Sequence, residues 1–433
     1  MNAAAGGRRV RPAIALVGLA AALSLAVAGC GGDDSGGSSG DSGGGGDSGG
    51  TVTVYSSMPL QGAPRAQSEK LVNGIKLALK QANNKAGNFD VKYVSLDDAT
   101  PQAGSWTPEA TSANARKASQ DDSAVAYIGE FNSGATAISL PVLNEAGLVQ
   151  VSPANSAVGL TTDGPGHEPG EPDKYYPSGE RTFARIVPTD AVQGGGMAQR
   201  AKDQNCTSLY VTNDKEVYGS GLAKNIVSAA EGLGLKIAGD DAIDPRAANY
   251  RALAQKMKSS GADCFAYAGI TANNAVQLFK DIYAANPDAK ALLGSDAVAE
   301  PAFTDPKEGG LPVEVAKHVT LTAVGLAPED YPPAGQKFFK DYAAEYGKGD
   351  PGQYAIFGYE AMALVLDAIK RAGDKGDDRT AVKDAIFSTK DRESVIGTYS
   401  IDENGDTSLT NYGVFGIKNG SLEYIGSLEA PSQ

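Results

Sequence analysis

From Thr51 onward the chain alternates short β-branched runs with longer helical segments, and this alternation constrains the fold most. Strands are predicted at TVTVYSS (51–57), DVKYVSL (90–96), AVAYIG (124–129) and LVQVS (148–152). Helices are predicted between them, at 67–85, 107–120 and 133–146. Elements in this order predict an α/β protein with a mainly parallel sheet and helices on both of its faces.

A Gly- and Pro-rich stretch at 161–180 interrupts this pattern, and the alternation then restarts. Further strands are predicted at 182–187, 208–213, 236–241 and 263–269. Further helices are predicted at 192–204, 219–233, 250–259 and 273–284. After His318 strands and helices are mixed, and the chain ends in a β-rich tail at 397–401 and 413–417. Two α/β lobes joined by several crossings of the chain fit this pattern better than two independent domains.

The residues before Thr51 predict export and lipidation. The cationic start MNAAAGGRRVRP is followed by an apolar run at 13–28, which is shorter than the about 20 residues of a membrane span. The run ends in Val-Ala-Gly-Cys at 27–30, which resembles the bacterial lipobox. We expect residues 1–29 to be a lipoprotein signal peptide, and lipid on Cys30 to hold the protein on the outer face of the cell membrane. The alternatives are an uncleaved membrane anchor or a plain secretory leader.

The segment 30–50 is predicted to be the lipidated cysteine and a flexible linker, because 31–50 contains only Gly, Ser and Asp. It contains GDSGG twice, at 40–44 and 46–50, which looks like the nucleophile motif of trypsin-like proteases. That motif requires a rigid turn between packed elements. An extracellular hydrolase is therefore disfavoured, and we expect no enzyme activity.

Charge and histidine content narrow the function further. The net charge of −14 repels phosphate backbones, so we expect no nucleic-acid partner. The two histidines, His167 and His318, lie far apart in sequence, which leaves little for His-based metal or triad chemistry. We expect no metal and no cofactor, and we favour binding in transport over catalysis.

Cys206 and Cys264 are each found at the start of a predicted strand of the second set. In an exported protein, two remaining cysteines are most simply read as a disulfide. Such a bridge contributes roughly 4 kcal/mol on the chain-entropy model. Buried free thiols are the alternative.

The stretch 127–161 is the most informative for recognition. A strand ends at Gly129 and Ser133 begins a helix, whose unpaired N–H groups and positive dipole end suit a carboxylate. The next strand ends at 152–156, and in a parallel sheet both loops emerge at the edge where ligands bind. Alternatively, Ser133 is only a helix cap and Ser156 only a loop hydroxyl.

In combination, these motifs resemble the type I periplasmic binding proteins of the leucine/isoleucine/valine-binding family. The resemblance covers 51–433 and is carried by Asn73-Gly74, Asp97-Asp98-Ala99, Ile-Gly-x-x-x-Ser at 128–133, Ser152-Pro153-Ala154, Asn213-Asp214-Lys215 with Tyr218-Gly219, Gly261-Ala262-Asp263 with Gly269, and Gly294-Ser295-Asp296. It implies two Rossmann-like lobes with parallel central sheets and a multi-strand hinge. Lobe 1 would comprise 51–188 plus 325–395, and lobe 2 would comprise 189–324 plus 396–433.

The resemblance also implies a set of ligand-binding residues. Ser133 would bind the α-carboxylate of an amino acid, and Ala154 and Ser156 would contact its ammonium and carboxylate. Asp296 would pair with the ammonium, and Tyr218 would cover the ligand. A zwitterion that leaves water needs both of its charges met by short, charge-assisted bonds, which agrees with this set. A turn or helix-cap aspartate is the alternative for Asp296.

Two positions of the implied pocket depart from the family pattern. The family has aromatic residues at two positions that line the pocket, and in this chain these positions are occupied by Ile270 and Gln67. These changes keep the frame for an amino acid and leave the preference for branched side chains in doubt. Trp106, Tyr175 and Tyr176 are further candidates for lining the cleft, or for ordinary packing.

The resemblance implies a lipid-anchored solute-binding protein that delivers an amino acid, branched-chain or related, to the membrane subunits of an ABC permease. Ligand binding would close the lobes by a hinge motion. We expect a monomer. The alternative function is an extracellular receptor that senses amides or other small polar solutes and takes no part in import.

Overall fold

The computed structural model describes residues 49–429. The predicted signal peptide, Cys30 and most of the predicted linker lie outside the described residues, so these predictions stay untested. Within 49–429, no helix is long and apolar enough to cross a membrane.

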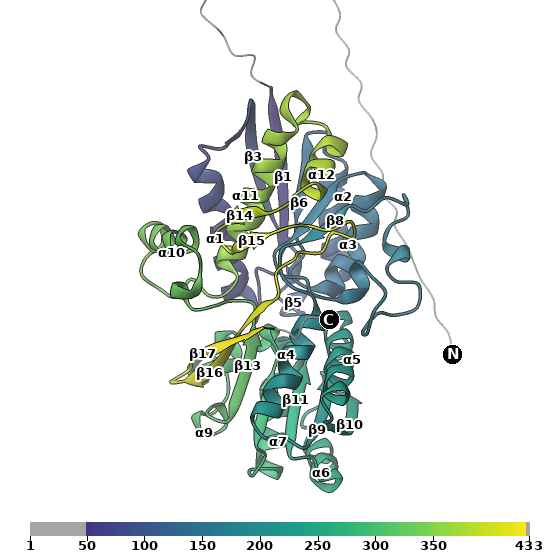
Figure 1. The fold of residues 1–433 in the computed structure, drawn as a ribbon, viewed down its shortest axis with the longest axis vertical. Coiled ribbons are helices and arrows are strands. Elements are labelled where there is room, and N and C mark those ends of the chain that lie inside the picture. The colour runs from purple at the N-terminus through teal and green to yellow at the C-terminus, as the bar shows by residue number, and fades with distance from the viewer. Residues whose placement is uncertain (1–48, 430–433) are drawn as a thin grey trace, which may run out of the picture. The chain divides into compact units, whose positions relative to one another are not determined.

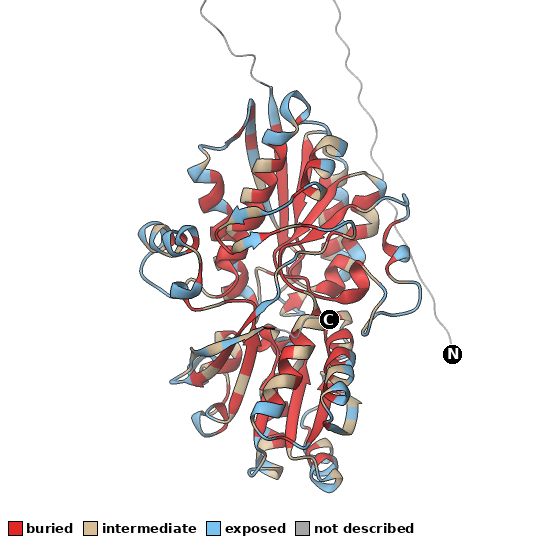
Figure 2. Ribbon diagram, in the orientation of Figure 1, coloured by how far each residue is buried: buried red, intermediate tan, exposed pale blue. Residues whose placement is uncertain are grey.

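The first sheet has strand order β2-β3-β1-β6-β7-β8. Its strands are β1 (Thr51–Met58), β2 (Lys85–Ala86), β3 (Phe89–Asp97), β6 (Ala124–Ile128), β7 (Val149–Ser152) and β8 (Phe183–Arg185). All neighbours pair in parallel except β2 with β3. Strand β1 is buried on both faces, as Figure 2 shows in red, because helices cover both sides of the sheet.

Those helices come from distant parts of the chain. On one face, α1 (Arg65–Gln81) packs against α11 (Ala355–Arg371), which in turn contacts α12 (Arg379–Phe387). On the other face, α2 (Pro108–Ser119) packs against α3 (Ser133–Glu145). The helix predicted at 67–85 is wrong at its end: it stops at Gln81, because Asn83 and Asn84 turn the chain with positive φ.

The second sheet has strand order β10-β9-β11-β12-β13-β16-β17. Its strands are β9 (Ser208–Asn213), β10 (Lys236–Ala242), β11 (Cys264–Ala268), β12 (Ala291–Gly294), β13 (Val319–Ala323), β16 (Asn411–Lys418) and β17 (Ser421–Glu429). The first five are parallel, and β16 and β17 add an antiparallel edge. One face is covered by α4 (Asp190–Asp203) with α5 (Val217–Gly232), and the other by α6 (Arg251–Ser260) with α7 (Ala275–Ala285).

The chain crosses between the two sheets repeatedly (Figure 1). It enters the second sheet after β8, and after β13 it returns through α10 (Pro333–Tyr346) and α11, which pack on α1. It reaches the second sheet again at β16. We call the first sheet with α1–α3 and α10–α12 the first lobe, and the second sheet with α4–α7 the second lobe. The residue boundaries expected for the two lobes stay a prediction.

The remaining short elements connect or cover the sheets. They are β4 (Ala99–Thr100), β5 (Ser105–Trp106), α8 (Pro301–Thr304), α9 (Val313–Ala316), β14 (Arg392–Ser394) and β15 (Gly397–Tyr399), with several 3-10 turns. The stretch 161–180 is mostly loop with one 3-10 turn, and its Tyr175 and Tyr176 pack on Leu140 and Leu160 of the first lobe.

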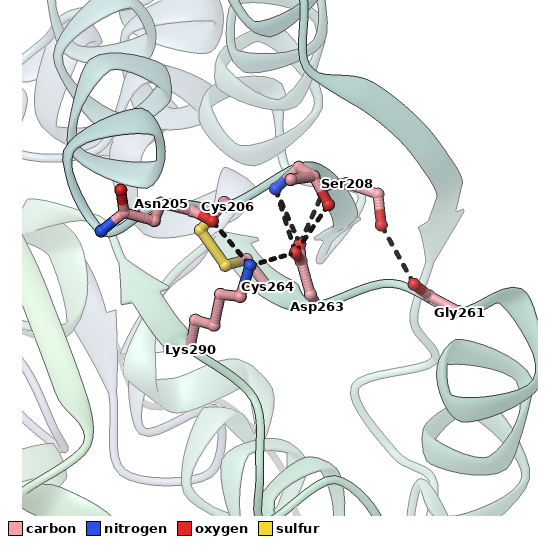
Figure 3. The surroundings of a disulfide bond; sticks show 8 residues. Asn205, Cys206, Ser208, Gly261, Asp263, Cys264 and Lys290 are labelled. Atoms are coloured by element: carbon pink, nitrogen blue, oxygen red, sulfur yellow. Dashed lines mark hydrogen bonds and ion pairs between the residues drawn. A yellow bond between two sulfur atoms is a disulfide. The ribbon is translucent and has the colours of Figure 1, made fainter.

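The structure joins Cys206 and Cys264 in a disulfide (Figure 3). Cys206 immediately precedes the loop into β9 and Cys264 begins the neighbouring parallel strand β11, which places their Cα atoms 5.9 Å apart. Asp263 beside the bridge forms an ion pair with Lys290 at 2.8 Å. The two sulfur atoms are bonded to each other, so they are not free as thiolate ligands for a metal.

Candidate ligand-binding site between the lobes

The first wall of the site is the beginning of α3. The helix starts at Ser133 because Asn132 has extended dihedral angles, and the Asn132 side chain makes no capping hydrogen bond. The first amides of α3 are therefore available to another acceptor, and the helix dipole adds positive potential there. The hydroxyl of Ser133 accepts a hydrogen bond from the amide of Ala157, 3.4 Å away, which links α3 to the next loop.

That loop, 153–161, carries Ala154 and Ser156, and hydrogen bonds from buried side chains of the first lobe hold it in place. Arg185 of β8 is fully buried, and its guanidinium donates to the carbonyls of Asn155 and Ala157 and to Asp406, the last at 2.6 Å. The side-chain amide of Asn155 donates to the carbonyl of Phe131 at 2.9 Å, which ties the loop to the turn before α3. These bonds fix the positions of both first-lobe loops at the carboxyl edge of the sheet.

The second wall is centred on Asp296, which follows β12. Its buried carboxylate accepts hydrogen bonds from Gln193 of α4 at 2.8 Å and from the hydroxyl of Tyr218 of α5 at 2.5 Å. The hydroxyl of Tyr354, which precedes α11 in the first lobe, also donates to it. Burial, together with the charge of Asp296, raises the pKa of Tyr218 and of Tyr354 well above the usual value. Both tyrosines therefore stay protonated and act as donors to this carboxylate.

A cavity between the lobes brings most of the predicted residues together. It is lined by Phe131, Asn132, Ser133, Ala154, Ser156, Tyr218, Ile270, Asp296, Ala297 and Tyr354. Gln67 lies in an adjoining chamber, and its side-chain amide donates to the carbonyl of Ala299 at 2.8 Å, across the interface between the lobes. The ring of Trp106 lies near Gly134. The roles of these residues in binding stay predictions.

Several residues of this site were missed by the sequence analysis. Tyr354 comes from a distant part of the chain, and its ring packs edge-on against Phe131 with centroids 4.9 Å apart. Gln193 and Asp190 lie at the beginning of α4, where polar residues are ordinary, so no signal in the sequence distinguishes them.

Asp190 adds a second acidic group near Asp296. Burial raises its pKa to about 8, and the charge of Asp296 acts in the same direction. Within the described part of the chain, neither oxygen of the Asp190 carboxyl has a partner in good hydrogen-bond geometry, although the nearby hydroxyl of Ser156 favours the charged form and lowers the pKa. At pH 7 the Asp190 carboxyl is therefore mostly protonated, and the negative charge of the second-lobe wall is that of Asp296, whereas the first-lobe wall offers N–H and O–H donors.

This arrangement suits a small molecule that carries both charges. A negative group fits at the beginning of α3, near the hydroxyls of Ser133 and Ser156, and a positive group fits against Asp296. Free space for water-sized molecules is only about 20 Å³ while the lobes are in contact. This is room for one or two waters.

Two parallel-sheet lobes with a binding cavity between them define the class of two-lobed solute-binding proteins. A family model described as periplasmic binding protein matches residues 51–421, and the chain belongs to this family. Members of this class bind solutes and are not enzymes, and the chain is a solute-binding protein.

Among curated proteins, the chain is 26% identical to Leu/Ile/Val-binding protein homolog 3 of Brucella melitensis, over 86% of this chain and 92% of the relative. It is 22% identical to the leucine-, isoleucine-, valine-, threonine-, and alanine-binding protein of Pseudomonas aeruginosa, over 84% of this chain and 89% of the relative.

Solved structures share the fold. The leucine-binding protein LivK of Thermotoga maritima matches with a TM-score of 0.73 and 22% identity, over 87% of this chain and 99% of LivK. A solute-binding protein of Rhodopseudomonas palustris in complex with benzoate matches with a TM-score of 0.70 and 17% identity, over 88% of this chain and 97% of that one. The predicted type I periplasmic-binding-protein fold is confirmed.

Proposed function

We propose that this protein is the lipid-anchored receptor of an ABC importer, which binds an amino acid between its lobes on the outer side of the cell membrane and delivers it to the permease. The observation that carries the proposal is the pairing of two opposite walls. The beginning of α3 with Ser133 faces the cavity from one lobe, and the buried carboxylate of Asp296 faces it from the other.

The α-carboxylate of an amino acid would accept hydrogen bonds from the first amides of α3 and from the hydroxyls of Ser133 and Ser156. Its ammonium would donate to Asp296 and to the carbonyl of Ala154. Both ligand charges would leave water only for charge-assisted bonds, which makes their burial favourable. Ile270 and Tyr218 would cover the apolar part of the ligand.

The small free volume indicates how binding would be coupled to delivery. The space that is free while the lobes touch holds only one or two waters, so entry of an amino acid would require the lobes to separate. Separation would break contacts between the lobes, such as the hydrogen bond from Gln67 to Ala299 and the ion pair of Glu168 with Lys224 at 2.5 Å. Closure around the ligand would present a distinct surface to the permease.

The membrane attachment is proposed from the sequence alone. Lipid on Cys30 and the tether up to residue 50 would hold a monomeric receptor near the permease, and acyl chains contribute about 0.8 kcal/mol for each buried methylene. The names of the curated relatives support an amino acid as the ligand class.

A ligand screen tests the proposal. The purified protein is mixed with each of the common amino acids and with benzoates, and the midpoint of thermal unfolding is measured. A ligand that binds only the folded state raises this midpoint, by an amount that corresponds to about 2.7 kcal/mol at a hundred times its Kd. We expect at least one amino acid to do so. If no amino acid shifts the midpoint while a benzoate does, the proposed ligand class is wrong.

A further inference from the structure

A buried carboxyl group lies beyond the site already described. Glu300 is the last residue before α8, shortly after the 3-10 turn that begins at Asp296, and the residue is 3% exposed. Its backbone carbonyl accepts the first hydrogen bonds of α8, from Phe303 and Thr304. The side chain makes no capping hydrogen bond, so helix capping does not explain why an acidic residue is buried here.

No cation of the described residues 49–429 forms an ion pair with Glu300; its polar neighbour is the hydroxyl of Thr271. Burial raises the pKa of Glu300 to about 8, although Thr271 acts in the opposite direction. A buried carboxyl group without a charged partner destabilises the free protein. A group of this kind that lines a cavity is a candidate for pairing with a ligand.

Glu300 is connected to the binding cavity. The chamber that adjoins the cavity, which we call the inner chamber, is lined by Pro64, Gln67, Ser105, Phe131, Asn132, Ile270, Thr271, Ala272, Ala297 and Glu300. It shares Phe131, Asn132, Ile270 and Ala297 with the cavity around Asp296. The two spaces therefore adjoin at these four residues, and a ligand held at Asp296 would reach Glu300 if its side chain passed between Phe131 and Ile270.

The far end of the inner chamber is rich in hydrogen-bond acceptors. Gln67 uses its NH2 group to donate to the carbonyl of Ala299, so its side-chain oxygen remains as a second acceptor in the chamber that Glu300 also lines. A branched aliphatic side chain would offer no hydrogen-bond donor to either acceptor. A nitrogen that donates hydrogen bonds would satisfy them.

Beyond Glu300 and Gln67 lies a larger outer cavity, with about 440 Å³ of free space. Lys70 lines it, but the ammonium of Lys70 lies near Gly352. Gln353 lines it too, and within residues 49–429 neither polar atom of its amide has a hydrogen-bond partner. Space for a longer polar side chain therefore continues past Glu300.

We propose that Glu300 receives the far end of the ligand's side chain, so that the preferred ligand is an amino acid whose side chain ends in a hydrogen-bond-donating nitrogen, with a cation as the best match. This inference rests on the proposed function, because it takes the α-ammonium and α-carboxylate to be held at Asp296 and Ser133. Glu300 then acts as the residue that determines side-chain specificity.

Isothermal titration calorimetry tests the inference with L-lysine, L-ornithine and L-glutamine against L-norleucine and L-leucine. Norleucine has the carbon chain of lysine without the terminal nitrogen. We expect the best of the three nitrogen-ended ligands to bind at least about 10-fold more tightly than norleucine. In Glu300→Gln this ligand should lose about 10- to 100-fold in affinity, the range of one charge-assisted hydrogen bond, while norleucine keeps its affinity. The matched control is Glu314→Gln, an exposed residue of α9 away from these cavities, which should leave all affinities unchanged.

A second variant separates specificity from folding. Glu300→Asp keeps the carboxyl group but withdraws it by one methylene, so the preference should move from ornithine towards lysine, a shift that a folding defect would not produce. The inference is overturned if norleucine binds as tightly as the nitrogen-ended ligands, or if Glu300→Gln weakens both kinds equally. If leucine binds and none of the nitrogen-ended ligands does, this inference alone is refuted. If no amino acid binds, the proposed function is refuted as well.

Discussion

Replacing Asp296 by asparagine removes the negative charge that this residue supplies to the proposed ammonium site, while keeping the size of the side chain. In the free protein, the carboxylate accepts hydrogen bonds from Gln193, Tyr218 and Tyr354. Three neutral donors orient the carboxylate without neutralising it, so its charge remains available to an ammonium group. We therefore expect the substitution to act mainly on ligand binding.

The magnitude follows from the burial of Asp296. Removing one partner of a buried charge pair costs about 2–5 kcal/mol in binding, and each 1.4 kcal/mol is tenfold in Kd. Because asparagine keeps one acceptor oxygen, we expect the lower part of this range, roughly a 30- to 300-fold increase in Kd. The stability of the free protein should change less, because the desolvation penalty of a buried carboxylate is removed together with its hydrogen bonds.

Calorimetric titration of the best amino acid from the screen measures this change, and thermal unfolding without ligand checks the fold. Asp288→Asn provides the matched control, because Asp288 is an exposed aspartate of the same lobe in the loop before β12. If Asp296→Asn stays folded and binds within about threefold of the unchanged protein, the ammonium is not held at Asp296 and the reasoning is refuted.

Three further predictions concern stability. The pKa of Asp190 is about 8 in the folded protein and about 3.9 in an unfolded chain. Its protonation therefore stabilises the fold at low pH, and this stabilisation is lost as the pH rises towards 8. Urea unfolding should give a lower free energy of unfolding at pH 8 than at pH 5, and Asp190→Asn should make this difference smaller. Arg185→Met leaves the Asp406 carboxylate without its cationic partner and removes the hydrogen bonds to the carbonyls of Asn155 and Ala157. It should lower the free energy of unfolding by about 3–5 kcal/mol, and an unchanged urea midpoint would contradict this. Replacing Cys206 and Cys264 by alanine should lower it by roughly 4 kcal/mol, and reducing agent should then have no further effect on the urea midpoint of this variant.

The first part of the fold could be predicted because its strands and helices are visible in short stretches of the sequence. Residues 51–152 follow a regular alternation of buried strands and helices, and their predicted strands agree with β1, β3, β6 and β7 to within one or two residues. The region after His318 was harder to predict because its elements pack on both lobes. Helix α11, for example, completes the first lobe by packing on α1, almost 300 residues earlier in the chain.

The candidate site shows the same limit. Ser133 could be predicted because it follows a predicted strand at the edge where ligands bind, whereas Asp296 was implied only by the resemblance to the family, since no strand was predicted before it. Tyr354 could not, because its contact with Asp296 joins positions that only the crossing of the chain between the lobes brings together. Gln67 was expected in the cavity itself, and it lies in the inner chamber because its amide bridges to Ala299 of the other lobe.

A crystal structure of the protein with its preferred amino acid would test the central claim most directly. We predict that the ligand lies between the lobes, with its carboxylate at the beginning of α3 near Ser133, its ammonium within hydrogen-bond distance of Asp296 and its side chain directed towards Glu300. A ligand bound outside this cavity, or bound in it with its ammonium away from Asp296, would contradict the account.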